Sequence, residues 1–184
     1  RFDSVTAPYL VAGPGARVLK SWKTAPSPSL TRHLLSGVRA RLLTGTETKP
    51  LLLIPVPQSA ARRWELEGGS VMRLCSMMLE ARANHEDVLY DLLEVRGRKD
   101  AQAMSRGDAR YAQISSISVR DLDAQEWGRL AERAFHSRIT LVDDFLTSGA
   151  TLRTAAKAVR EKFAELGVFR GREIRLDVFV LGFR

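Results

Sequence analysis

Residues 138–151 read Arg-Ile-Thr-Leu-Val-Asp-Asp-Phe-Leu-Thr-Ser-Gly-Ala-Thr, and this stretch decides the fold. Residues 139–142 are β-branched or apolar, as in a buried strand. Two acids and a Thr-Ser-Gly turn follow, and the chain then has the periodicity of a helix up to Gly167. The apolar residues on one face of that helix are Leu152, Ala155, Ala156, Val159, Phe163 and Leu166. Strand, acidic turn and helix in this order predict one unit of a parallel α/β sheet.

The rest of the chain repeats this alternation. Apolar residues recur at helical spacing in three further segments, residues 30–42, 71–79 and 124–135. Short apolar runs typical of buried strands occupy residues 51–56, 88–95 and 174–180. Strands that alternate with helices predict an α/β fold with a mainly parallel central sheet flanked by helices. The length of 184 residues and an apolar fraction of 45% predict a single domain over residues 1–184.

The composition favours a soluble protein of a reducing compartment. No apolar run approaches the roughly 20 residues that a membrane helix needs, and nothing near Arg1 resembles a signal peptide. Cys75 is the only cysteine, which excludes an internal disulfide and a thiolate zinc cluster. It lies among apolar residues of a predicted helix, so we expect a core thiol rather than a nucleophile. We therefore expect a cytoplasmic protein with no membrane contacts.

The formal net charge of +8 predicts an electropositive surface that attracts polyanions. Both phosphate-rich small molecules and nucleic acid meet this description. Because the basic residues are scattered over the whole chain, we expect only weak nucleic-acid binding that does not depend on sequence. The three histidines, His33, His85 and His136, are far apart and lack the spacing of metal ligands.

The acidic turn after residue 142 has the features of a ligand site. In an open α/β sheet ligands bind at the carboxyl ends of strands. Small side chains, hydroxyls and a glycine over residues 147–151 let backbone N–H groups converge on an anion at a helix N-terminus. Asp143 and Asp144 would repel that anion, so sugar hydroxyls are their natural partners. The simpler interpretation, a helix cap and a turn, accounts for single elements of the pattern but not for its full order.

That full order resembles the signature of type I phosphoribosyltransferases. The resemblance implies that the loop after the acids holds the 5-phosphate of phosphoribosyl pyrophosphate (PRPP), and that the catalytic acids Asp143 and Asp144 approach the ribose hydroxyls. The implied 5-phosphate site comprises Thr147, Ser148, Gly149, Ala150 and Thr151. The implied cofactor is Mg²⁺, which arrives with PRPP and has no direct protein ligand. If the strand stays regular through both acids, only one can project into the site, and the sequence does not decide which.

Other stretches are similar to the ComF/GntX-like branch of that family. They are an apolar-Lys-aromatic segment at residues 18–23, the strand at residues 53–57, and Gln102 followed by Arg110. The lysines of the first segment, Lys20 and Lys23, are equally compatible with an ordinary surface. The chain departs from the branch at residues 67–70, where Glu-Gly-Gly-Ser replaces Arg-Gly-Phe-Asn and puts an anion near the expected pyrophosphate.

By the same resemblance, two loops bind the diphosphate. The residues implied for the pyrophosphate loop are Gln58, Ser59, Arg62 and Arg63. Those implied for a mobile loop that closes over the ligand are Arg98, Lys99, Gln102, Arg106 and Arg110. Solvated surface charge is the alternative interpretation for both sets.

Two functions stay open at this point. The first is an enzyme that binds PRPP or a nucleoside monophosphate and transfers phosphoribosyl to a nitrogenous base. The second is a non-catalytic ComF-like module that acts in DNA uptake, in competence or in nucleic-acid handling. The intact motif at residues 143–151 favours the first, whereas Glu67 and the high charge favour the second. The resemblance leaves a homodimer open, and the acceptor base cannot be inferred, because fold alone does not define function.

Overall fold

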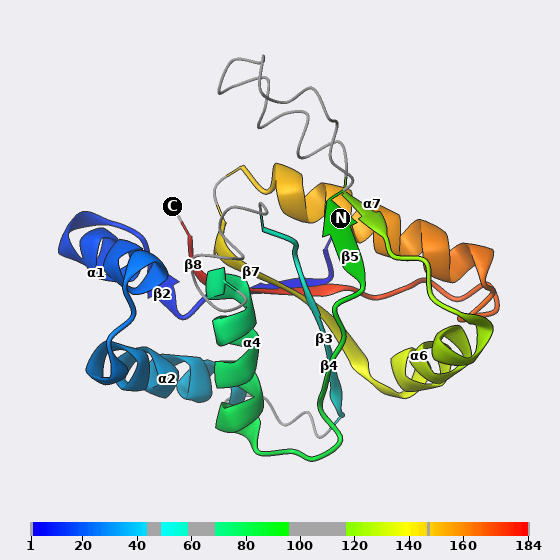
Figure 1. Ribbon diagram of the computed structural model, residues 1–184, viewed down its shortest axis with the longest axis horizontal. Helices are drawn as coiled ribbons and strands as arrows, with labels where there is room; N and C mark the ends of the chain where they lie inside the picture. The colour runs from blue at the N-terminus through cyan, green and yellow to red at the C-terminus, as the bar shows by residue number, and fades with distance from the viewer. Residues whose placement is uncertain (1, 44–48, 59–68, 96–116, 147, 184) are drawn as a thin grey trace.

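The centre of the protein is a parallel β-sheet with helices on both faces (Figure 1). The computed structural model describes residues 2–43, 49–58, 69–95, 117–146 and 148–183. The strands of this sheet are β1 (Ser4–Thr6), β2 (Tyr9–Leu10), β3 (Leu51–Pro55), β4 (Val88–Leu89), β7 (Arg138–Leu146) and β8 (Asp177–Phe183). The helices are α1 (Gly13–Thr24), α2 (Pro28–Leu43), α4 (Gly69–Arg82), α6 (Ala124–His136) and α7 (Ala150–Glu165).

The strand order is β1-β8-β7-β3-β4, with β2 also paired to β8, and every pairing in this sheet is parallel. The middle strands are buried on both faces, which explains why β3 reads as a continuous apolar run. A second sheet pairs β5 (Leu93–Val95) with β6 (Ile117–Val119) in antiparallel orientation. The carboxyl ends of β3 and β7 lie side by side, so that segments far apart in the chain meet at one edge.

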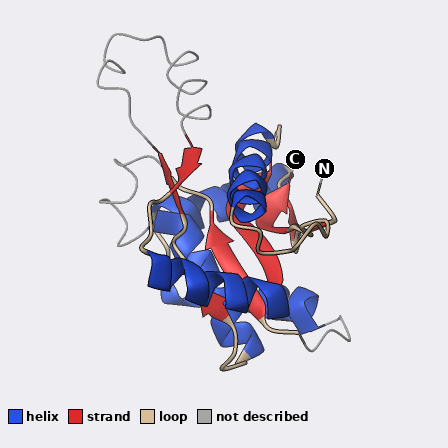
Figure 2. Cartoon of the chain, turned by 90° about the vertical axis from the view of Figure 1, so that its right-hand side faces the viewer, coloured by secondary structure: helices blue, strands red, loops and turns tan. Residues whose placement is uncertain are grey.

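Helices lie on both faces of the parallel sheet (Figure 2). A hydrophobic cluster fills the space between the sheet and the helices on each face. One face packs against α6 and α7, whose core residues include Leu130 and Phe163. The other packs against α1, α2 and α4, with Trp22 and Leu74 among its fully buried side chains. Residues of β7 alternate between the clusters in the usual way of a strand, Leu141 in the first and Val142 in the second.

The N-terminal segment is held against α2 by Tyr9. The Tyr9 hydroxyl donates a hydrogen bond to the carbonyl oxygen of Leu34, 3.2 Å away. A Cβ placed on Gly37 would lie 2.1 Å from the same hydroxyl oxygen. A glycine therefore permits the close approach of β2 to the middle of α2, at a position where most helices carry a larger residue.

The predicted α/β class with a mainly parallel sheet and flanking helices is confirmed. The four predicted helices correspond to α2, α4, α6 and α7. The single strand predicted at residues 88–95 is wrong, because the chain divides there into β4 and β5 of two different sheets. The strand predicted at residues 174–180 begins later, at Asp177, although Ile174 and Leu176 before it are buried. Cys75 is a core residue, and burial raises the pKa of its thiol.

Candidate functional site

Asp144 lies at the centre of a buried polar network near the end of β7. The strand runs to Leu146, so both acids belong to it rather than to a turn. The Oδ2 atom of Asp144 accepts hydrogen bonds from Ser70 Oγ at 2.7 Å and from Gln58 Nε2 at 2.9 Å. The same oxygen forms an ion pair with Lys23 Nζ. A carboxylate that is 5% exposed is thereby compensated by one charged and two neutral donors.

These three donors come from three separate segments. Lys23 belongs to the last turn of α1, Gln58 follows β3, and Ser70 stands in the first turn of α4. Gln58 Nε2 also donates to Ser70 Oγ at 2.9 Å, which links the two neutral donors to each other. The parallel register of β3 against β7 places Pro55 beside Val142, and so carries Gln58 to the height of Asp144. The network therefore depends on the sheet and on both helices.

Strict alternation does not hold through both acids, because Phe145 packs against the same cluster as Val142, and Leu146 packs against the other. Asp143 directly precedes Asp144 in β7. It is paired in register with Val180 of β8, and its Oδ1 accepts a hydrogen bond from the Asp144 N–H at 2.8 Å. Burial, and secondly the negative charge of Asp144, raise the pKa of Asp143 to about 7. The hydrogen bond from the backbone and the positive charge of Lys23 oppose that rise. Asp143 therefore changes its charge near neutral pH.

The helix after β7 begins with features that suit an anion. Gly149 is its N-cap residue and has φ 68°, in the left-handed region that favours glycine. Gly149 has no side chain to cap this N-terminus, the Ala150 N–H donates to Ser148 Oγ at 3.4 Å, and the first turn contains no acidic residue. A Cβ at position 149 would lie 3.3 Å from the Arg153 Nη1 atom, so the guanidinium of Arg153 lies directly beside Gly149. The helix dipole and this cation together make the turn electropositive.

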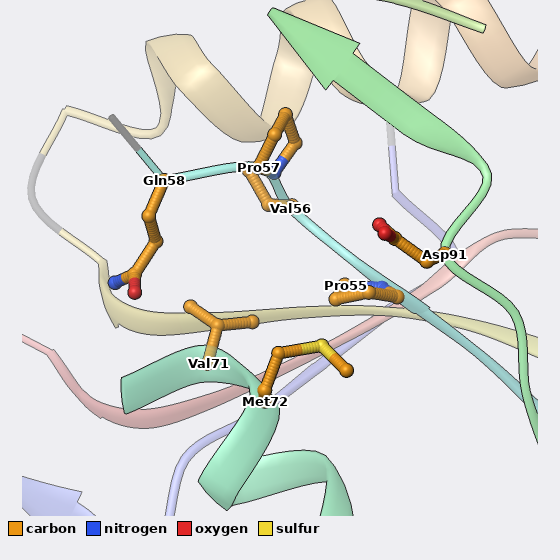
Figure 3. A pocket seen from close by; sticks show the side chains of 7 residues that line it. All are labelled: Pro55, Val56, Pro57, Gln58, Val71, Met72 and Asp91. Carbon is orange, nitrogen blue, oxygen red and sulfur yellow. The ribbon is translucent and has the colours of Figure 1, made fainter. Parts of the chain in front are cut away.

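A small hollow lies at the ends of β3 and β4 (Figure 3). Its volume is about 150 Å³, and its lining residues are Pro55, Val56, Pro57, Gln58, Val71, Met72 and Asp91. The Asp91 carboxylate lies across the hollow from Gln58 and forms an ion pair with Arg120, with 2.7 Å between Oδ2 and Nη2. Since its charged lining residue is an acid, the hollow does not suit a phosphate.

The structure brings several of the predicted site residues to one edge of the sheet. Asp143, Asp144, Gln58 and residues 148–151 all lie near the carboxyl ends of β3 and β7. Gln58 was expected to contact pyrophosphate, and in the structure its amide donates to Asp144. The predicted residues Thr147, Ser59, Arg62, Arg63, Arg98, Lys99, Gln102, Arg106 and Arg110 lie outside the described residues.

Three residues of this site were missed or left undecided by the sequence analysis. Lys23 is 19% exposed in its side chain and is bound to Asp144, so it is not an ordinary surface lysine. Ser70 was noticed only as part of a departure from the family pattern, and it proves to be buried. The sequence contains one indication of the role of Arg153. It follows Gly149 by four residues, and residues four apart in a helix lie on the same face.

The expected cofactor can be tested against the donor set. Among the residues that the structure describes, no group of three or more His, Cys, Asp or Glu side chains could hold a metal ion. The Oδ2 atom of Asp144 is engaged by three donors, and Asp143 is the preceding residue. Binding of Mg²⁺ together with a diphosphate stays a prediction. In the described part of the chain, no helix is long and apolar enough to cross a membrane.

Comparisons with known proteins assign no family to the chain. No family model matches it, and no curated protein matches it. Among solved structures it is similar to a hypoxanthine phosphoribosyltransferase from Staphylococcus aureus, with 14% sequence identity and a TM-score of 0.42. The similarity covers 84% of this chain and 63% of that enzyme, so the chain spans less than two thirds of the enzyme's length.

Proposed function

We propose that this protein binds the ribose 5-phosphate part of PRPP and transfers phosphoribosyl to a nitrogenous base. The observation that carries the proposal is the sequence of features at the end of β7. An acid with a pKa near neutrality, Asp143, is followed by a glycine in the left-handed region and by a helix N-terminus with Arg153 beside it. One end of this arrangement suits sugar hydroxyls and the other suits a phosphate.

The roles of the residues follow from their charges. The phosphate would lie at the N-terminus of α7, where backbone N–H groups of residues 149–151 and the Arg153 guanidinium attract it. Ionised Asp143 would accept hydrogen bonds from the ribose hydroxyls and so orient the sugar. Bound Mg²⁺ would neutralise the leaving diphosphate. Asp144 stays bound to Lys23 and holds the strand end in place.

The proposed transfer balances as a substitution at C1 of the ribose. The bond from C1 to the pyrophosphate oxygen breaks, and a bond from C1 to a nitrogen of the base forms. The nitrogen loses a proton, which Asp143 can accept because its pKa is close to 7. An acid that was fully ionised and strongly solvated would be a weaker base for this purpose.

A non-catalytic ComF-like role is the second candidate. It is favoured by the engagement of Asp144, whose Oδ2 atom already accepts from two neutral internal donors and pairs with Lys23. The net charge of +8 also supports contact with nucleic acid. In this case the site would bind a ribose phosphate without turnover.

Calorimetry and a product assay separate the two candidates. PRPP with Mg²⁺, ribose 5-phosphate and inorganic phosphate are titrated into the wild type, and into Asp143→Asn with Glu173→Gln as an exposed control. Pyrophosphate release is then measured with a panel of bases. We expect PRPP to bind and Asp143→Asn, but not the control, to lose affinity and turnover. Binding without turnover for any base supports the second candidate. The ribose phosphate site itself is refuted if millimolar PRPP does not bind.

A further inference from the structure

Lys23 is the charged partner of a carboxylate that has little contact with water. The side chains of Lys23 and Asp144 are 19% and 7% exposed, and the other two donors to Asp144, Ser70 and Gln58, are neutral. A buried carboxylate that loses its cation either destabilises the fold or takes up a proton. Among the three donors to Asp144 Oδ2, Lys23 is therefore the one that carries a charge.

The position of Lys23 is itself fixed by neighbours. Its Nζ lies 5.2 Å from the centre of the Phe145 ring, so the ammonium contacts two consecutive residues of β7. Its carbonyl oxygen accepts a hydrogen bond from Arg73 Nη2 of α4, at 3.3 Å. The Arg73 guanidinium in turn lies 5.3 Å from the ring of Trp22, a fully buried residue. The end of α1 is thus anchored to α4 where Lys23 reaches β7.

We infer that Lys23 is a positioning residue of the proposed ribose site. It holds Asp144 in place, and Asp144 donates its backbone N–H to Asp143 Oδ1 and places its own charge beside the Asp143 carboxylate. The inference rests on the proposed function for the identity of the ligand, a ribose phosphate. The contacts among Lys23, Asp144 and Asp143 do not depend on any ligand. The contacts on which the inference depends are the ion pair to Asp144, the Phe145 ring contact, and the backbone hydrogen bond between Asp144 and Asp143.

The electrostatic consequence has a definite sign. The charged groups that act on Asp143 are Asp144, which disfavours its ionisation, and Lys23, which favours it. Loss of Lys23 removes a positive charge beside two adjacent carboxylates. Because such carboxylates titrate as a coupled pair, the first proton should then bind to the pair at a higher pH. Loss of both Lys23 and Asp144 removes the larger repulsion together with the smaller attraction, and should have the opposite effect.

The test is a carboxyl carbon NMR titration of the full chain with labelled aspartate. The variants are Lys23→Met, Lys23→Arg, and the control Lys20→Met, which removes an exposed lysine of the same helix. In Lys23→Met we expect the upper apparent pKa of the acid pair to rise by about one unit. It should stay close to the wild-type value in Lys23→Arg and in Lys20→Met. As the pH is lowered, the affinity for ribose 5-phosphate should begin to fall at a higher pH in Lys23→Met than in the wild type.

A second variant covers the case in which Lys23→Met does not fold. Lys23→Met/Asp144→Asn leaves no unpaired charge, and in it the pKa of Asp143 should fall below its wild-type value. The inference is overturned if the apparent pKa of the pair is unchanged in Lys23→Met, if it shifts equally in Lys20→Met, or if the double variant folds with a raised pKa. If the titration shifts as expected but the wild type binds no PRPP or ribose 5-phosphate, the proposed function fails, and the hold of Lys23 on the acid pair stands.

Discussion

Ser70 Oγ lies 2.7 Å from Asp144 Oδ2, so the first turn of α4 is hydrogen-bonded to the strand that carries both acids. The two residues are 1% and 5% exposed, so both partners of this hydrogen bond are buried. The hydrogen bond therefore belongs to the fold as well as to the site. Its removal has a cost that can be measured without a ligand.

Ser70→Ala should lower the free energy of unfolding by about 1 to 3 kcal/mol, because it removes one donor from a buried carboxylate. Ser76→Ala is a matched control in the same helix, since Ser76 is exposed and its hydroxyl only donates to the Met72 carbonyl. The control should change stability by less than about 0.5 kcal/mol. Urea unfolding measures both, and equal effects would show that the contact to Asp144 contributes nothing.

Asp143→Asn should stabilise the protein in alkaline but not in acidic solution. The folded-state pKa of Asp143 is raised from 3.8 to about 7, so the folded protein binds this proton more tightly than the unfolded chain does. The wild type therefore loses stability as the pH rises from about 4 to 7, whereas the amide has no such proton. At pH 8 the gain should be roughly 1 to 3 kcal/mol, and at pH 4 it should be close to zero. Urea unfolding at the two pH values measures this difference in the free energy of unfolding. A gain in stability at pH 4 but not at pH 8 would contradict the prediction.

Arg153→Gln should weaken ribose 5-phosphate binding by roughly ten-fold, because a charge-assisted hydrogen bond to the phosphate is lost. The control is Lys157→Gln, which removes an exposed cation one turn further along α7, beside Glu161. The two variants change the net charge equally, so general attraction of anions affects them alike. Calorimetry at two salt concentrations measures the affinity of each variant. Equal losses of affinity in Arg153→Gln and Lys157→Gln would contradict the proposed position of the phosphate.

Gly37→Ala should destabilise the protein although alanine is the better helix former. The new Cβ would lie 2.1 Å from the Tyr9 hydroxyl oxygen, so Tyr9 must move and lose its hydrogen bond to Leu34. A loss of about 1 to 3 kcal/mol is expected for such overpacking. Gly128→Ala in α6 has open space around the new Cβ and should stabilise by roughly 0.5 to 1 kcal/mol. Thermal unfolding of the two variants should therefore give opposite signs.

The sequence predicts local features of this protein well, because they depend on neighbours along the chain. The unit of β7 and α7 follows from apolar periodicity. The pair of Lys23 and Asp144 does not follow, since it depends on how α1 packs against a distant strand. For the same reason the sequence leaves two interpretations of Lys23 open, a family segment and an ordinary surface lysine, until the packing is known.

The break between β4 and β5 was missed for a related reason. Residues 88–95 are apolar enough for one strand, and only the pairing partners show that Leu89 and Leu93 belong to different sheets. The backbone hydrogen-bond partners of a strand can lie far away in the chain, whereas those of a helix are four residues away. Periodicity therefore identifies a helix more completely than it identifies a strand.

The position of β8 in the sheet affects the order in which the protein can fold. β8 pairs with β7 on one side and with β1 on the other, and its first residue, Asp177, accepts hydrogen bonds from both Ser4 and Arg138. During synthesis β1 and β7 both leave the ribosome before β8, so neither can complete its pairing until then. A nascent chain that ends before Asp177 would expose one edge of β7, to which a strand of another chain could pair.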